Sequence, residues 1–461
     1  MLSSNCTSFS AWAKVEGETG GPTSGDVPNA GGAPGGTASE PDTGLRRHAV
    51  TKAIKALAAR PKKRRREFDM VFSEPHCTEA RRTAQGADSV FQQLLTVDGY
   101  DTLPVMTRAY WPLLAPLTVY AQTATPAYPN QVAGDFVMRN FNFHSGETLD
   151  ELRLHYITIG KPARDASGHV NNAVLILHGT GGTGEPFLRA NFGGELFEPG
   201  QPLDAASHFL ILPDSIGHGK SSKPSDGLHA RFPHYDYEDM VRAQFRLLQE
   251  GLKVDHLRLV MGTSMGAMHT WVWGYMYPDA IDALMPLASA PVEIAGRNRM
   301  FRAMIIQAIR GDPAWHGGEY TIPPADGLIA AEYALWMMTS SPLQLQKANP
   351  TRDKADSAIA VLRERAEQVD ANDMLYQYEA SGDYNPEPHL TEIRAPLWAI
   401  NSADDEVNPP ELGQVARGIE KVPHGRYILI PTSDETRGHG THSQAAVWKQ
   451  YLVDLLRLTE R

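Results

Sequence analysis

Short, continuous apolar runs recur along the chain and predict the strands of a buried parallel sheet. A strand that helices cover on both faces has no solvent side, so its sequence is apolar throughout. The segment 152–160 instead alternates apolar and polar residues, which predicts an antiparallel or edge strand. The continuous runs occupy residues 173–177 and 209–213, and further strands of the same sheet are expected at 257–260, 284–288, 395–400 and 426–430.

Helical patterns lie between these runs. Apolar residues at helical spacing predict a helix over 236–252 and a last helix over 443–458. Strand, helix and strand in succession indicate a mostly parallel, doubly wound α/β domain, which we expect over residues 125–461. The alternation stops at about 292–390, where helical patterns at 299–309, 328–338 and 353–368 predict an inserted helical cap.

A serine between two glycines follows the run at 257–260. In Gly262-Thr263-Ser264-Met265-Gly266 a strand turns directly into a helix, and only small residues at the two glycine positions avoid a collision. This geometry raises Ser264 above the sheet edge and leaves the Met265 amide at a helix N-terminus, where negative charge is favoured. The pattern therefore predicts a nucleophilic serine.

A serine hydroxyl needs a base to take its proton and a third group to orient that base. Where such a serine elbow joins a strand to a helix, the acid and then the histidine come later in the chain, each after a strand. The loop after 395–400 contains Asp405, and the loop after 426–430 contains His439. We assign Asp405 as the orienting acid and His439 as the base, with Asp404 and His442 as neighbours that could take their places.

The loop after 173–177 can supply the second amide of an oxyanion hole, and we assign it to Thr180, beside the amide of Met265. Read literally, Gly179, Gly181 and Gly184 also fit the dinucleotide fingerprint Gly-x-Gly-x-x-Gly. That fingerprint must open a helix, and the sequence after residue 184 does not predict a convincing one. We therefore expect no cofactor.

A weak metal-binding pattern lies at 434–442. His439-x-x-His442 with Asp434 or Glu435 lacks a third fixed ligand, and a structural, hydrogen-bonded role is more common for a histidine such as His442. We therefore expect no metal ion.

Composition and charge narrow the class of protein. The 461 residues are 42% hydrophobic and 21% charged, as in an ordinary globular enzyme. The net charge of -11 argues against nucleic acid as a partner, because phosphate binding calls for a basic face. Both cysteines, Cys6 and Cys77, precede the predicted domain, which therefore has no disulfide, thiolate nucleophile or cysteine metal site.

The first 105 residues have the composition of a disordered tail, with few large apolar side chains. Their basic run at 61–66 fits a nuclear address, a nucleic-acid patch or a solvated charged stretch.

Residues 106–124 resemble a secretory signal peptide, with one positive charge, a short apolar run and a cleavage site after Ala121. The run is too short to span a bilayer, so we expect no stable membrane insertion. Our hypothesis is that translation starts at Met106 and that residues 1–105 are not part of the native protein. The protein would then be periplasmic or secreted, and otherwise cytoplasmic. An apolar linker is the alternative, and N-terminal sequencing of the natively expressed protein distinguishes the two.

Several stretches resemble the α/β-hydrolase superfamily and, within it, the homoserine O-acetyltransferase-like branch. The resemblance covers about residues 136–458. It implies the α/β-hydrolase fold, a helical cap that narrows access to Ser264, an acyl-enzyme mechanism and often a homodimer. Its most specific pieces are residues 262–268, 308–320, 370–376 and 408–410.

Two residues depart from the pattern of that branch. The resemblance implies an arginine for the homoserine carboxylate six positions before Asp312, where this chain has Ile306. It also implies an aspartate after the catalytic histidine, where this chain has Gly440. Losing both would weaken recognition of a zwitterionic amino acid by a few kcal/mol. Arg302 and Arg310 are the nearby candidates to replace the arginine.

These observations predict a serine hydrolase that acts on an ester or related small-molecule acyl substrate through an acyl-enzyme intermediate. Acetyl-CoA would be absent outside the cytoplasm, which favours water as the acyl acceptor if the protein is exported. The alternative is a homoserine O-acetyltransferase-like acyltransferase that uses acetyl-CoA. A non-catalytic binding module is a third possibility, which the complete set of Ser264, Asp405 and His439 disfavours.

Overall fold

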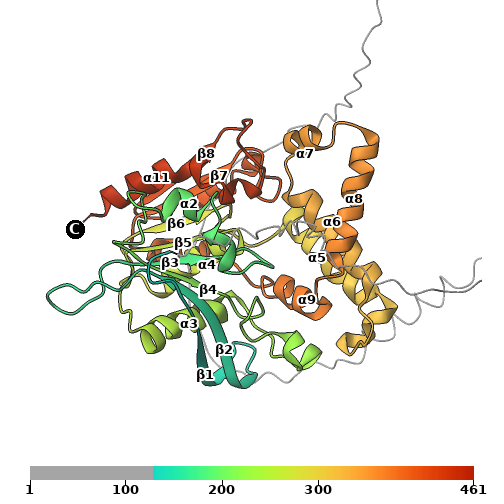
Figure 1. Cartoon of the computed structure of the whole chain (residues 1–461), viewed down its shortest axis with the longest axis horizontal. Helices are drawn as coiled ribbons and strands as arrows, with labels where there is room; N and C mark the ends of the chain where they lie inside the picture. The colour runs from blue at the N-terminus through green and yellow to red at the C-terminus, as the bar shows by residue number, and fades with distance from the viewer. Residues whose placement is uncertain (1–127, 461) are drawn as a thin grey trace, which may run out of the picture. The chain divides into compact units, whose positions relative to one another are not determined.

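The computed structural model describes residues 128–460, which fold around an eight-stranded sheet (Figure 1). The predicted disordered tail and signal-peptide-like segment lie outside the described residues. The strand order is β1-β2-β4-β3-β5-β6-β7-β8; β1 and β2 run antiparallel to their neighbours, and the other pairs are parallel. The strands are β1 (Val132–Asn142), β2 (Thr148–Ile159), β3 (Ala173–Leu177), β4 (Phe209–Pro213), β5 (Leu259–Thr263), β6 (Leu284–Leu287), β7 (Leu397–Ser402) and β8 (Gly425–Ile430).

The central strands are buried on both faces, as their continuous apolar sequences predict. Every residue of β3 to β7 is buried. In β3, Leu175 belongs to one apolar cluster, whereas Val174 and Ile176 belong to a second cluster on the other face. The predicted doubly wound α/β class is therefore confirmed.

Helices cover both faces of this sheet. Helices α3 and α4 contribute Met240 and Trp271 to the first cluster, and α2 and α11 contribute Leu196 and Trp448 to the second. The segment predicted as one helix over 236–252 is α3 followed by a π-helical stretch, Leu247–Leu252. The helices outside the cap are α2 (Gly193–Leu196), α3 (Tyr237–Arg246), α4 (Met265–Met276), α10 (Gln414–Ile419) and α11 (Ala445–Leu458).

The cap is inserted between β6 and β7, and its helices gather at one side of the sheet (Figure 1). Its apolar core joins Phe301 and Ile305 of α5 to Leu328 of α6 and Met374 of α9. Helices α5, α6 and α8 match predicted helices, whereas α7 and α9 were not predicted. The cap helices are α5 (Gly296–Gly311), α6 (Ala325–Thr339), α7 (Pro342–Ala348), α8 (Arg352–Ala366) and α9 (Ala371–Glu379).

Helix α9 ties the cap to the segment that follows β4. Its N-cap, Asp370, accepts hydrogen bonds from the Asp373 amide and the Tyr320 hydroxyl. The Asp373 carboxylate accepts from the Ser225 amide and hydroxyl at 2.8 and 2.7 Å. The Tyr376 hydroxyl donates to a backbone carbonyl of residues 230–232. The stretch 370–376, which carries part of the family resemblance, therefore attaches the cap to the segment after β4.

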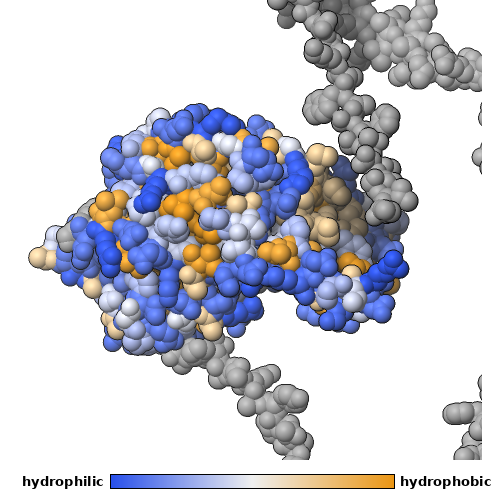
Figure 2. All heavy atoms as spheres, turned by 90° about the horizontal axis from the view of Figure 1, so that it is seen from above, coloured by the Kyte–Doolittle hydropathy of each residue, from blue (hydrophilic) through white to orange (hydrophobic). Residues whose placement is uncertain are grey.

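The surface seen in Figure 2 is mainly hydrophilic, with apolar patches between the polar side chains. No helix within residues 128–460 combines the length and apolar character needed to cross a membrane.

The turn between β5 and α4 leaves no room for side chains at its glycines. A Cβ on Gly262 would lie 2.1 Å from the Gly266 carbonyl oxygen, and a Cβ on Gly266 would lie 2.1 Å from the Leu177 carbonyl oxygen. We expect Gly262→Ala or Gly266→Ala to lower the free energy of unfolding by about 3 kcal/mol or more, because backbone must move to admit the methyl group. Denaturant titration measures this change.

Gly311→Ala is the matched control, because a Cβ there meets nothing within 4 Å and the residue ends α5. We expect it to be neutral or slightly stabilising. Alanine variants at 262 and 266 that unfold with the same midpoint as Gly311→Ala would contradict the steric argument.

Candidate active site

Ser264 lies at the sharp turn between the end of β5 at Thr263 and the start of α4 at Met265. Its backbone angles are φ 54° and ψ −112°, a strained conformation for a residue with a side chain. The Ser264 amide donates to the Leu287 carbonyl of β6 at 2.9 Å, which fixes the turn to the sheet.

His439 joins Ser264 to Asp405. Its Nε2 lies 2.8 Å from the Ser264 Oγ, and its Nδ1 lies 3.0 and 3.1 Å from the two carboxylate oxygens of Asp405. A carboxylate only accepts hydrogen bonds when ionised, so Nδ1 carries the proton and Nε2 is free to accept that of the serine. This arrangement can activate a serine for attack on a carbonyl carbon.

Asp405 remains ionised although it is 1% exposed. Burial alone would raise the pKa of its carboxyl, but the charge and hydrogen bond of His439, with hydrogen bonds from Asn408 and the Val407 amide, outweigh burial and lower the pKa. The lowered pKa keeps a negative charge beside the histidine ring.

The neighbouring Asp404 has different contacts. One of its carboxylate oxygens accepts hydrogen bonds from the Ser341 and Thr436 hydroxyls and the Gly438 amide, at 2.9 to 3.0 Å. Asp404 therefore holds the loop that carries His439 and does not contact the histidine ring itself.

His442 is also outside the row of hydrogen bonds that joins Asp405, His439 and Ser264. Its Nδ1 is hydrogen-bonded to the Ser443 hydroxyl at 2.9 Å, and its ring is perpendicular to that of His439 at 5.3 Å between centroids. Burial, with a smaller effect of His439, lowers the pKa of His442 to about 3, so it is neutral near pH 7. The structure thus brings Asp405 and His439, and not Asp404 or His442, into line with Ser264.

The loop after β3 lies against the serine. A Cβ on Gly179 would lie 3.2 Å from the Ser264 Cβ. The Gly179 carbonyl accepts from the His178 Nδ1–H at 2.8 Å and from the Gly182 amide at 3.0 Å. Since the C=O and N–H of a trans peptide point in opposite directions, these bonds turn the Thr180 N–H away from them. Sequence reasoning did not identify this anchoring role of His178.

Thr180 and Met265 each present a backbone amide at this point. Neither N–H donates to a protein acceptor within residues 128–460. The Met265 amide is at the first turn of α4, where amides have no intrahelical partner. The two amides are therefore available to a developing oxyanion.

A cavity of about 370 Å³ lies over the serine, between the sheet and the cap. Ser264, His439 and Thr180 contribute to its lining. Charged residues of the cap also line this cavity. The sequence analysis named Arg302 as a candidate but did not identify the other two. The apolar lining includes Pro186, Phe187, Phe192, Phe301, Leu335, Trp336 and Val407, and the charged cap residues are Arg302, Glu332 and Arg365.

The glycine loop does not form a dinucleotide site. Residues Glu185–Leu188 form a single short 3₁₀ turn and not the long helix that such a fingerprint opens. The Gly179 end of the loop approaches Ser264 instead.

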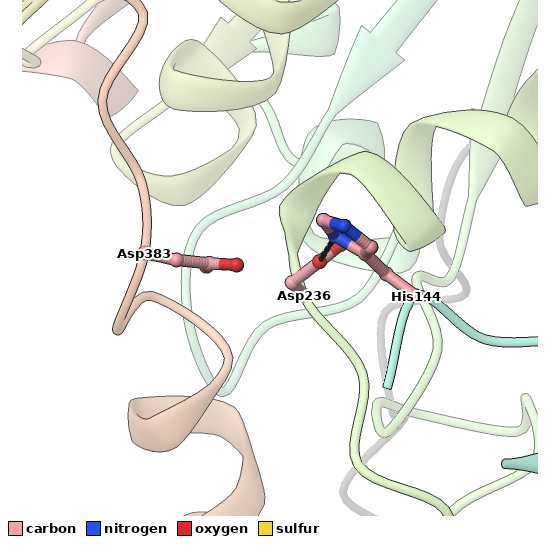
Figure 3. A group of neighbouring side chains, drawn as sticks. All are labelled: His144, Asp236 and Asp383. Atoms are coloured by element: carbon pink, nitrogen blue, oxygen red, sulfur yellow. Dashed lines mark hydrogen bonds and ion pairs between the residues drawn. The ribbon is translucent and has the colours of Figure 1, made fainter. Parts of the chain in front are cut away.

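The histidines of the weak metal-binding pattern have the contacts described above: His439 with Ser264 and Asp405, and His442 with Ser443. Within the described range, the group with ligand atoms close enough for a cation is His144, Asp236 and Asp383 (Figure 3). His144 is hydrogen-bonded to Asp236 at 2.7 Å, and Asp383 reaches toward them from a separate segment. None of these three residues lines the cavity over Ser264.

The residues at the two departures from the homoserine O-acetyltransferase pattern occupy different surroundings. Ile306 packs against the apolar core of the cap, and Gly440 lines the cavity. Arg310 forms an ion pair with Glu379 and does not line the cavity, whereas Arg302 does.

The fold and this site define the class of α/β enzymes that carry a serine at a strand-to-helix elbow beneath a cap. The chain belongs to the α/β hydrolase fold family, whose sequence profile matches residues 172–435. The resemblance found in the sequence is thereby confirmed at the level of the family.

Its relatives include acyltransferases. A probable acyltransferase of Methanothermobacter thermautotrophicus is 27% identical over 70% of this chain and 97% of its own length. The homoserine O-acetyltransferase of Moorella thermoacetica is 29% identical over 68% of this chain and 94% of its own length. The crystal structure of an acetylester hydrolase from Corynebacterium glutamicum has the same fold, with a TM-score of 0.63 and 22% identity over 71% of this chain and 96% of that one.

The two adjacent aspartates allow a direct test of the site geometry. We expect Asp405→Asn to slow hydrolysis of 4-nitrophenyl acetate by roughly 10³- to 10⁴-fold, because the amide no longer stabilises the histidine in the required tautomer. Asp404→Asn keeps an oxygen for the loop and is expected to change the rate less than 10-fold. Steady-state kinetics of both variants, with thermal unfolding to verify folding, decide the assignment. A larger loss in Asp404→Asn would reverse it.

Proposed function

We propose that the protein is a serine hydrolase that cleaves an ester or related acyl substrate through an acyl-enzyme intermediate. The observation that carries this proposal is the continuous contact from Asp405 through His439 to the Ser264 hydroxyl, at the base of the cavity. The same constellation recurs on unrelated folds that perform acyl transfer.

In the first half of the proposed reaction, the Ser264 Oγ attacks the substrate carbonyl carbon while His439 Nε2 takes its proton. The carbonyl oxygen becomes an oxyanion and accepts hydrogen bonds from the Thr180 and Met265 amides. His439 then gives the proton to the leaving alkoxide, and the C–O bond breaks to leave an acylated Ser264.

In the second half, water takes the place of the alcohol. His439 removes a proton from water as its oxygen attacks the acyl carbon, and the same two amides stabilise the second tetrahedral intermediate. Its collapse releases the acid and returns the proton to Ser264. Asp405 stays ionised throughout and stabilises the charged histidine.

The choice of water over an amino acid as acceptor rests on the cap and the histidine loop. Ile306 is apolar and packs into the cap core, and Gly440 has no side chain to hold an amine. A site without the charged side chains at positions 306 and 440 loses several kcal/mol of its recognition of homoserine, and Gly440 in particular leaves the amine without a partner. A hydrolase also fits the fold it shares with an acetylester hydrolase.

The second candidate is acyl transfer from acetyl-CoA to homoserine or a related alcohol. It is supported by relatives that bear the names acyltransferase and homoserine O-acetyltransferase and align with most of their own length to this chain. Both candidates share the acyl-enzyme on Ser264 and differ only in the acceptor.

Active-site labelling tests the nucleophile. We expect a fluorophosphonate probe to label the wild-type protein and to leave Ser264→Ala unlabelled, because the probe forms a covalent bond with an activated serine. Gel fluorescence and peptide mass spectrometry give the extent and the position. A matched Ser443→Ala control, which removes a hydroxyl that lines the same cavity and is hydrogen-bonded to His442, is expected to keep the label. Equal labelling of Ser264→Ala would refute the assignment.

The acceptor is tested by following thiol release from acetyl-CoA with and without homoserine, beside acid release from simple acetate esters. We expect ester hydrolysis that depends on Ser264 and no increase in thiol release when homoserine is added. Thiol release that appears only with homoserine would instead establish the transferase.

A further inference from the structure

Arg302 places a buried positive charge at the cavity over Ser264. The residue comes from α5, lines the cavity and is 3% exposed. Its Nε donates to the Asn298 side-chain oxygen at 2.9 Å, and its Nη1 donates to the Ser381 hydroxyl at 3.0 Å. Both partners are neutral, so they orient the guanidinium without balancing its charge.

No carboxylate pairs with Arg302 among residues 128–460. The acidic side chain that lines the cavity, Glu332, has Arg365 as its ion-pair partner at 3.6 Å. The rings of Phe301 and Tyr378 lie 5.5 and 5.6 Å from the guanidinium carbon, and their faces offset part of the charge. A buried cation without a counter-ion is unfavourable, which indicates that a ligand supplies the negative charge.

The guanidinium lines the same cavity as Ser264, His439 and Thr180. The Tyr237 hydroxyl is near the side chains of Arg302, Ser381 and Thr180, and Thr180 belongs to the loop beside Ser264. That hydroxyl is buried and has no hydrogen-bond partner in the described part of the chain. A guanidinium has five N–H donors, and Arg302 uses one on Nε and one on Nη1, so donors remain available between the cap and the oxyanion loop.

We propose that Arg302 binds a carboxylate of the substrate, so that the preferred substrates are esters with a negative charge on the acyl or the alcohol part. This inference rests on the proposed hydrolase function and names its substrate class. A guanidinium presents parallel N–H groups that match the two oxygens of a carboxylate, which a neutral ester cannot use. The Glu332 and Arg365 charges offset each other, so the cap side of the cavity is positive overall.

The test uses two pairs of esters that differ only by a carboxylate in place of a methyl group. In the first pair, mono-4-nitrophenyl adipate and 4-nitrophenyl hexanoate, the carboxylate or methyl group is on the acyl part. In the second pair, 4-acetoxybutanoate and butyl acetate, it is on the alcohol part. We expect wild type to prefer the charged member of one pair by about 10- to 100-fold in kcat/KM. Arg302→Met should abolish that preference by lowering kcat/KM for the charged member much more than for the neutral one.

Arg302→Lys keeps the charge without the planar fork and should retain part of the preference. Arg299→Met removes an exposed arginine of the same helix and should retain all of it. The inference is overturned if wild type treats both members of both pairs alike. It is also overturned if Arg302→Met slows both members of a pair equally, as for a residue that acts on the oxyanion or only on folding.

A binding measurement separates this inference from the hydrolase proposal. Calorimetry of adipate with Ser264→Ala needs no turnover, and we expect adipate to bind at least 10-fold more weakly when Arg302→Met is added. If no ester is cleaved but adipate binding depends on Arg302, the hydrolase proposal fails and the carboxylate site stands. If esters are cleaved and adipate binds equally to both proteins, the carboxylate site fails.

Discussion

The site depends on one steric constraint, the direct passage of β5 into α4 at Ser264. A residue with φ 54° in this turn is strained by about 1 to 3 kcal/mol, and the buried strand and helix on either side hold it there. The close packing that excludes side chains at Gly262 and Gly266 is the same packing that raises the serine hydroxyl above the sheet. It also sets the Met265 amide at the start of the helix, where its N–H has no partner within residues 128–460.

Two adjacent aspartates, Asp404 and Asp405, have different roles beside this turn. Asp405 is buried against the His439 ring, and the pKa of its carboxyl is lowered because the His439 charge and the hydrogen bonds that Asp405 accepts outweigh burial. Asp404 is partly exposed and uses its hydrogen bonds to fix the backbone at Gly438, one residue before the histidine. One carboxylate therefore places a negative charge beside the ring of His439, the proposed base, and the other fixes the backbone that carries it. The short loop after β7 places both of them within reach of a single histidine.

The sequence predicts features that depend on a few neighbouring residues. It does not predict features that form when distant segments come together in the fold. The strands β3 to β7, the elbow at Ser264 and the order of Asp405 and His439 follow from runs and motifs a few residues long. Strand β1 was missed because an edge strand keeps one side in solvent and has no continuous apolar run. The second strand was correctly predicted as antiparallel, although β1 covers it. Helix α7 was missed because seven residues carry too little periodicity. The cavity lining comes from several separate loops and helices, so no single pattern marks it.

The sheet fixes the positions of Ser264, His439 and Asp405, and the cap supplies much of the lining of the cavity above them. Arg302 and Ile306 lie four residues apart on α5, which is about one helical turn or 6 Å along the axis. Arginine at 306 would belong to the family pattern, whereas here that position packs into the cap core and the arginine at 302 faces the cavity. A cation is thus kept near the serine but displaced by a turn. A ligand carboxylate bound to Arg302 would therefore lie at a different distance from the Ser264 hydroxyl than one bound to an arginine at position 306. Because the distance between a substrate's charge and its reacting carbonyl is set by its own bonds, the proposed carboxylate site would favour a substrate whose length differs from that of homoserine.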